Sequence, residues 1–137
     1  MGTRSTIALE FADGTVEQVY CHWDGYLENN GKILQAHYMD PFKVKELVAL
    51  GGFSSLDTTV EGTKATAYTQ RGEDLDINKF KDYADYVANH QYEEYEYILR
   101  QVDGKAVWFV ADHDNVYVTL ESAIADEQDR IAQEETA

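Results

Sequence analysis

Residues 4–11 read RSTIALEF, and the turn ADG follows directly at residues 12–14. Apolar and polar side chains alternate along the first stretch, which is typical of a half-buried β-strand. Gly14 suits the left-handed position of a three-residue hairpin loop. Such a loop pairs Phe11 with Thr15 and gathers the apolar side chains of both strands on one face, whereas a two-residue loop would divide them between the faces. The start of the chain therefore predicts an antiparallel β-hairpin.

Helical and hairpin patterns follow along the rest of the chain. Apolar residues have a helical spacing over residues 33–38, and Asp40 before Pro41 is typical of the capped start of a second helix. Asp103-Gly104 is a strong signal for a tight hairpin turn. The other expected elements are a helix over residues 76–89, strands over 95–102, 105–111 and 116–118, and a last helix capped by Thr119.

This order of elements predicts an α+β fold, in which antiparallel β-hairpins with about four to five strands carry roughly three to four helices on one face. The length of 137 residues and the hydrophobic fraction of 44% are enough for one buried core, so we interpret residues 1–137 as a single domain. Ten Tyr, five Phe and two Trp exclude a disordered acidic tail.

Acidic residues outnumber basic ones, with 26 Asp and Glu against 11 Lys and Arg and a formal net charge of −15. Residues 1–72 hold 6 basic and 9 acidic residues, whereas residues 73–137 hold 5 basic and 17 acidic ones. A negative charge of this size disfavours binding to phosphate backbones or to anionic membranes. We therefore expect no direct contact with nucleic acid or a membrane, and a protein partner with a basic surface.

The cysteine and histidine content predicts neither a metal site nor a cofactor. A single cysteine, Cys21, permits no internal disulfide, which is typical of a reducing cytoplasm. It falls on the apolar face of the hairpin, so we expect a packed, unreactive thiol. The four histidines have no zinc-ligand spacing. The stretch DHDN at residues 112–115 starts like a calcium loop but lacks the later Gly and Glu. Neither a transmembrane segment nor a secretory leader is expected.

A polar group of residues near the end of the first hairpin is one candidate site. In the predicted register, His22 lies opposite Arg4 on the outer face. The two arginines of the group could hold an anionic ligand while a histidine or carboxylate acts as acid or base. The alternative is a surface hydrogen-bond cluster. The candidate ligand-binding residues are Arg4, Tyr20, His22, Asp24, Arg71 and Glu73.

The acidic second half of the chain offers a different candidate site. Its carboxylates are interleaved with tyrosines, whose rings lose little entropy when an interface covers them. If the segments are adjacent, they could bind the Lys and Arg residues that otherwise neutralise phosphates. The alternative is that these charges only solvate the surface. The expected partner-binding residues are Asp82, Asp85, Tyr86, Glu93, Glu94, Glu96, Asp126, Glu127 and Asp129.

Several short motifs together resemble a family of small proteins encoded mostly by bacteriophages and prophages. The most specific is YCHWDGY at residues 20–26, preceded by TRSTI at residues 3–7, where the family pattern is TRSxI. Supporting motifs are Asp13-Gly14, Gly31, Leu34, His37-Tyr38, VALG at 48–51, SSL at 54–56, Tyr68, RGE at 71–73, Asp103-Gly104 and Trp108. Similar proteins often have Arg-Asp where this chain has Thr69-Gln70. The resemblance covers about residues 3–110, excludes the acidic helix over residues 119–137, and implies a phage setting but no reaction.

Together these features favour a phage accessory protein that acts in the host cell cytoplasm by binding and inhibiting a host protein. The target would be a defence or nucleic-acid-processing complex, whose basic groove the acidic surface occupies as a nucleic-acid mimic. No complete catalytic constellation is present, so we do not expect an enzyme. The alternative is a protein that binds a small anionic, nucleotide-like ligand, or a hydrolase, with its site at the end of the first hairpin. A purely structural role for YCHWDGY is a third possibility.

Overall fold

A computed structural model describes residues 3–90, 92–112 and 116–136 of the chain. Its centre is a six-stranded sheet with the strand order β3-β2-β1-β4-β5-β6. Neighbouring strands are antiparallel except β1 and β4, which are parallel. The strands are β1 (Ser5–Glu10), β2 (Val16–Cys21), β3 (Asn78–Phe80), β4 (Tyr95–Val102), β5 (Lys105–Asp112) and β6 (Val118–Thr119).

Helical segments connect the strands and follow the last one. The longest is α5, which forms the C-terminal end of the described chain. Two short segments are not α-helical: η1 is a π-helical turn, and η2 is a 3₁₀ turn. The segments are η1 (Leu27–Gly31), α1 (Lys32–His37), α2 (Pro41–Val48), α3 (Val60–Lys64), η2 (Tyr68–Arg71), α4 (Tyr83–Asn89) and α5 (Leu120–Thr136).

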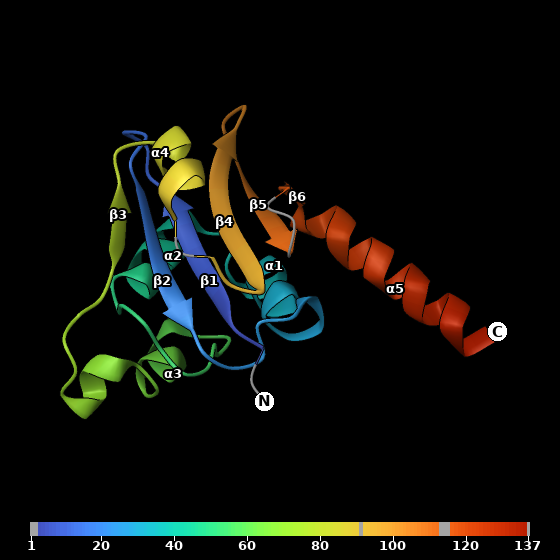
Figure 1. Ribbon diagram of the computed structural model, residues 1–137, viewed down its shortest axis with the longest axis horizontal. Coiled ribbons are helices and arrows are strands. Elements are labelled where there is room, and N and C mark those ends of the chain that lie inside the picture. Colours follow the sequence, from blue (N-terminus) through green and yellow to red (C-terminus); the bar gives the residue numbers. More distant parts are fainter. Residues whose placement is uncertain (1–2, 91, 113–115, 137) are drawn as a thin grey trace.

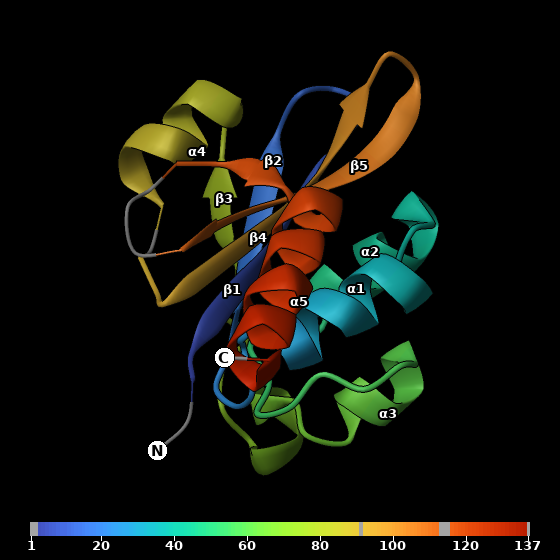
Figure 2. The same cartoon turned by 90° about the vertical axis from the view of Figure 1, so that its right-hand side faces the viewer.

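The sheet lies between two helical layers. Helices α1, α2 and α3 cover one face, whereas α4 lies on the opposite face (Figures 1 and 2). Helix α5 begins at the β5–β6 edge of the sheet and extends away from the body (Figure 1). The predicted α+β class is confirmed, with the addition that one helix packs on the second face.

The first hairpin has the predicted register. The N–H of Phe11 donates to the carbonyl of Thr15 at 2.8 Å, and Ile7 lies opposite Val19. Gly14 closes the three-residue loop with a φ of +91°, in the left-handed region that favours glycine. The pattern of residues 4–21 was therefore enough to predict which side chains face the core.

Two further turn signals are confirmed. Asp103 and Gly104 both have positive φ, 52° and 79°, as a type I′ turn requires, and they join β4 to β5. Asp40 caps α2, because its Oδ1 accepts a hydrogen bond from the N–H of Phe42 at 3.0 Å, and Pro41 is the first residue of the helix.

The helix predicted over residues 76–89 is shorter than expected. Residues Asn78–Phe80 form β3 instead, and Phe80 pairs with Val16 on the open edge of β2. Asp82 then caps α4, accepting a hydrogen bond from the N–H of Asp85 at 2.8 Å. The prediction was wrong at this end because pairing with a distant strand outweighs the local helical spacing.

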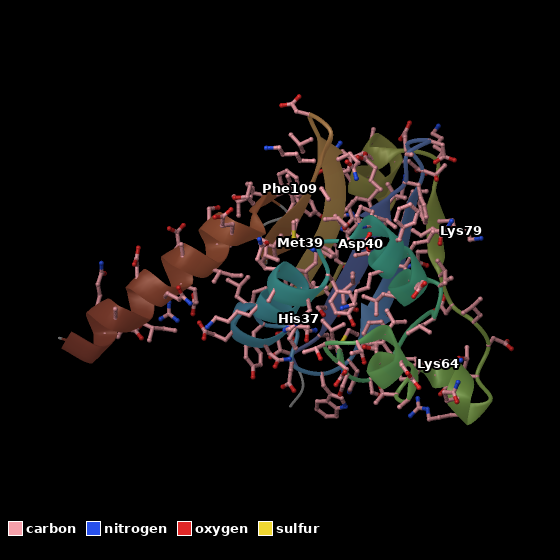
Figure 3. All side chains as sticks on the ribbon, turned by 180° about the vertical axis from the view of Figure 1, so that it is seen from behind. His37, Met39, Asp40, Lys64, Lys79 and Phe109 are labelled. Atoms are coloured by element: carbon pink, nitrogen blue, oxygen red, sulfur yellow. The ribbon has the colours of Figure 1, made fainter. Side chains whose placement is uncertain are left out.

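The main core lies between the sheet and the helices α1, α2 and α3. Figure 3 shows the molecule from this side, with Asp40 labelled at the start of α2. Trp108, Tyr38 and Tyr97 are among its largest fully buried side chains. The indole N–H of Trp108 donates to the carbonyl of Tyr38 at 2.9 Å, which joins β5 to the end of α1. A smaller core, which includes Ile98, packs under α4 on the other face.

Candidate functional site

The motif YCHWDGY at residues 20–26 forms the end of β2 and the loop after it. The N–H of His22 donates to the carbonyl of Phe53 at 3.2 Å. The N–H of Gly25 donates to the carbonyl of Thr3 at 2.7 Å. The motif therefore ties the first hairpin to the segment around Phe53, next to the candidate ligand site.

Part of the motif has a structural role. A Cβ on Gly25 would lie 2.6 Å from the Cβ of Ser5, so only glycine fits this approach. The hydroxyl of Tyr97 donates to the carbonyl of Gly25 at 2.6 Å. Cys21 is fully buried, with its Sγ 3.4 Å from the Nδ2 of Asn30. Burial raises the pKa of the Cys21 thiol, so it stays protonated and is a poor nucleophile.

A cavity of about 330 Å³ opens beside the end of the hairpin, and we name it the Tyr20–Tyr68 pocket. The rings of Tyr20 and Tyr68 lie side by side with their centroids 6.4 Å apart. Gly52 lies against the ring of Tyr68, where a Cβ would come within 3.0 Å of it. The pocket is lined by Arg4, Tyr20, Gly52, Tyr68, Asp76 and Glu93.

The structure brings only part of the predicted ligand site together. Arg4 and Tyr20 line the pocket, and the hydroxyl of Tyr20 lies 2.8 Å from Nδ1 of His22. Asp24 lies on the exposed loop with a φ of 57° and does not line it. Among the described residues, no hydrogen bond joins His22 to Asp24 or Glu73.

Arg71 and Glu73 pair with each other instead of lining the pocket. Nη2 of Arg71 lies 2.6 Å from Oε2 of Glu73, and both side chains are more than half exposed. The guanidinium carbon of Arg71 also lies 4.6 Å from the ring centroid of Tyr68. Of the two arginines expected to hold an anion, only Arg4 is among the described lining residues.

The residues of the predicted acidic surface lie in separate parts of the molecule. Helix α4 covers a face of the sheet, whereas α5 extends from the β5–β6 edge (Figures 1 and 2). Asp82 and Asp85 have capping roles at the start of α4, and Asp85 accepts a hydrogen bond from the N–H of Lys81 at 3.0 Å. This bond is the main reason that the pKa of Asp85 is lowered. Asp126 and Asp129 are exposed on α5.

Two expected members of the acidic surface are buried and cannot belong to it. The exposed fractions of Tyr86 and Glu96 are 0% and 3%. Strand alternation places Glu96 on the face of Ile98, which α4 covers. Glu94 is exposed, and Glu93 lines the Tyr20–Tyr68 pocket. The acidic surface as predicted is therefore not one continuous patch.

Tyr86 and Glu96 belong to a buried hydrogen-bond network with His90 and Tyr117, which we name the His90–Glu96 network. Nε2 of His90 lies 2.7 Å from Oε1 of Glu96, and the hydroxyl of Tyr117 donates to the same oxygen at 2.8 Å. The hydroxyls of Tyr117 and Tyr86 are 3.0 Å apart. The network was not predicted from the sequence, because strand alternation alone places Glu96 on the face opposite Tyr97, and only the packing of α4 buries that face.

Both ring nitrogens of His90 face acceptors. Nδ1 lies 2.6 Å from the carbonyl of Tyr86, which can only accept, so Nδ1 carries a proton. When Nε2 is also protonated, it donates to Glu96, and His90 is an imidazolium held by that side chain. Burial opposes this charge, but the hydrogen bond to Glu96 and its negative charge outweigh burial and raise the pKa of His90.

We expect the His90 contribution to the free energy of unfolding to fall as the pH rises above about 6.5, the pKa of an unfolded histidine. His90 binds its proton more tightly in the folded state, so its contribution is complete below that pH. It is lost as the pH rises through the raised folded-state pKa. The slope can reach about 1.4 kcal/mol per pH unit, measurable by urea unfolding between about pH 6 and about pH 9.

The control for this measurement is His90→Gln, which cannot titrate. The difference between wild type and variant separates His90 from the other three histidines and from the general charge of the chain. A difference that stays constant across the pH range would show that His90 has the same pKa in the folded and unfolded states.

Over residues 3–90, 92–112 and 116–136, no three His, Cys, Asp or Glu side chains are grouped to hold a metal ion. Residues 113–115 of the DHDN stretch lie outside the described residues. None of the described helices combines the length and the apolar character needed to cross a bilayer.

Comparison of the chain with models of protein families, with curated proteins and with solved structures gives no match. The geometry itself defines an α+β protein with a tyrosine-lined, charged pocket at the end of its first hairpin and an acidic helix that extends from the body (Figure 1).

Proposed function

We propose that this protein is a phage accessory protein that acts in the host cell cytoplasm by binding and inhibiting a host protein with a basic surface. The observation that carries the proposal is the extension of acidic α5 from the body (Figure 1). The phage setting is supported by the resemblance of residues 3–110, above all YCHWDGY. The target class, a defence or nucleic-acid-processing complex, is supported by the net charge of −15.

Helix α5 is anchored at one end and exposed at the other. Leu120 is fully buried, and Ile124 packs partly against the main core. Further along the helix, Asp126 and Asp129 are exposed. Arg130 is the only basic residue in the α5 sequence. The exposed part of α5 thus presents mainly negative charge to a partner.

Ion pairs within α5 support its exposed half. Isolated helices shorter than about 12–15 residues are marginally stable in water, so this half needs stabilisation of its own. The guanidinium of Arg130 bonds to Glu127 and lies 2.6 Å from Oε1 of Glu134, one turn away on each side. The bond to Arg130 is the main reason that the pKa of Glu127 is lowered. Carboxylates held on such a helix are arranged before a partner arrives.

A helix with this charge suits a groove lined by Lys and Arg. Fixed carboxylates can occupy the positions that phosphates would take and so exclude nucleic acid. The long-range field of the chain would also attract a basic partner and speed its association. Both effects are weakened by salt, because counterions screen exposed charges.

The experiment compares two variants with the same net charge. The α5 variant combines Glu121→Gln, Asp126→Asn and Asp129→Asn, which leaves Arg130 and its two partners intact. Tagged full-length protein is used to capture partners from infected cells, followed by quantitative mass spectrometry and a direct affinity measurement. We expect the α5 variant to lose about tenfold or more in affinity, because three of the exposed contacts to basic side chains are gone.

The matched control combines Glu46→Gln, Glu61→Gln and Asp74→Asn, which neutralises exposed carboxylates outside α5. It should retain its partner almost fully. Equal losses in the two variants would reject α5 as the binding surface. An affinity that does not change between about 50 and about 500 mM salt, or the lack of any stable host partner, would reject the proposed function.

A further inference from the structure

The Tyr20–Tyr68 pocket contains two kinds of group that bind organic cations. The rings of Tyr20 and Tyr68 both line the pocket, with their centroids 6.4 Å apart, and we call them its tyrosine wall. Aromatic rings attract cations to their faces. Asp76 and Glu93 add carboxylates to the same lining. Its volume of about 330 Å³ falls at the small end of the usual range for ligand sites. The pocket is therefore suited to a single side chain or a similarly small molecule.

The chain itself contains a guanidinium–tyrosine contact at the edge of this pocket. Arg71 lies over the ring of Tyr68, 4.6 Å from its centroid, while its Nη2 pairs with Glu73 at 2.6 Å. A planar guanidinium can stack on an aromatic ring and bond to a carboxylate at the same time. The ring of Tyr68 thus already takes part in the kind of contact that an arginine ligand would make.

The charge balance of the lining favours a cation over an anion. Arg4 contributes one positive charge, whereas Asp76 and Glu93 contribute two negative ones. Arg71 is paired with Glu73 and adds no net charge at the edge. The net charge of −15 on the whole chain acts in the same direction. An anionic ligand would have to approach against this field with Arg4 as its only described cationic contact.

We propose that the Tyr20–Tyr68 pocket binds the guanidinium group of an arginine side chain from a protein partner. The guanidinium stacks against the tyrosine wall and donates hydrogen bonds to Asp76 and Glu93. Arg4 is placed to bond a carbonyl or carboxylate of the partner backbone segment beside that arginine. The inference rests on the proposed function in one respect, which is that the partner is basic.

The test uses the full chain and N-acetyl-arginine amide as the probe. Titration is followed by NMR chemical shifts and by calorimetry, with N-acetyl-lysine amide and inorganic phosphate as comparison probes. We expect the arginine probe to bind most tightly and to shift the signals of Tyr20 and Tyr68. The variants Asp76→Asn and Tyr68→Leu should each weaken its binding roughly three- to tenfold, as expected for the loss of a charged or aromatic contact.

The matched control is Asp74→Asn, an exposed carboxylate two residues from Asp76 that does not line the pocket. It should bind the arginine probe like wild type. The inference would be overturned if this probe did not bind, or if the lysine probe or phosphate bound more tightly. It would also be overturned if Asp74→Asn and Asp76→Asn weakened binding equally. Capture of a host partner by α5 is a separate measurement. If the arginine probe does not bind the pocket, the proposed function still stands. If no host partner is captured, binding of the probe to the pocket can still be measured.

Discussion

Replacement of Glu96 by alanine is expected to lower the free energy of unfolding by about 3–5 kcal/mol, as is typical when one partner of a buried ion pair is removed. The Glu96 side chain is 5% exposed, and its carboxylate lies 2.7 Å from Nε2 of His90. Its loss leaves the imidazolium of His90 buried without a counter-charge. Tyr117 also loses the acceptor of its hydroxyl proton. Urea unfolding followed by circular dichroism near neutral pH measures the change.

Glu94→Ala is the control for Glu96→Ala, because Glu94 is exposed two residues earlier in the chain. We expect it to change the free energy of unfolding by no more than about 0.5 kcal/mol. Glu96→Gln keeps the shape of the side chain and should give a smaller loss than alanine. A loss below about 1 kcal/mol for Glu96→Ala would contradict the buried ion pair inferred here.

Trp108→Ala is expected to lower the free energy of unfolding by about 3–5 kcal/mol through the cavity that it leaves. Trp108 is 1% exposed and lies opposite Leu99 in the middle of the β4–β5 pair. The variant also leaves the carbonyl of Tyr38 without the indole N–H, 2.9 Å away in the wild type. A buried acceptor without its donor costs about 1–3 kcal/mol, so the effect should lie near the upper end of the range.

Trp23→Ala is the comparison for Trp108→Ala, because the Trp23 side chain is 43% exposed. We expect a loss of less than about 1 kcal/mol from this exposed position. The chain has two tryptophans, so Trp23→Ala also leaves Trp108 as the only indole fluorophore for following unfolding. Similar losses for the two variants would contradict the central place of Trp108 in the core.

Elements that depend on neighbouring residues were predictable from the sequence. Asp13-Gly14 determined the loop and register of the first hairpin, Asp40 marked the start of α2, and Asp103-Gly104 marked the second hairpin. In each case a short polar or glycine residue has a local conformational role, so the signal lies within a few positions. These signals are independent of how the elements later pack.

Pairing between distant segments was not predictable in this way. The parallel pairing of β1 with β4 joins Ser5 to Tyr95, and no local pattern specifies it. The strand β3 has only three residues, Asn78–Phe80. Ile77 and Phe80 continue the helical spacing of the apolar residues Ala84 and Val87 in the helix that follows. Its pairing with β2 is visible only when the open strand edge is known.

The candidate sites show the same division between local and distant contacts. Arg4 and Tyr20 line the same pocket and Tyr20 contacts His22, which agrees with the neighbourhood expected from the hairpin register. Asp76, the first residue of the helix predicted over residues 76–89, lines the pocket although no local pattern connected it with the first hairpin. Glu96 was assigned to the surface because its charge was considered without the helix that covers its face. Composition alone does not distinguish a solvated carboxylate from one buried against a histidine.

The position of β1 between β2 and β4 has a consequence for the order of folding during synthesis. The hairpin of β1 and β2 can close once Cys21 has left the ribosome, because its pairing is local. The other edge of β1 has to wait for β4, whose partner residues lie 90 positions later in the chain. An open strand edge can pair with other chains during that interval. Nascent chains are therefore most exposed to aggregation before residues 95–102 emerge, when the future centre of the sheet is still an edge.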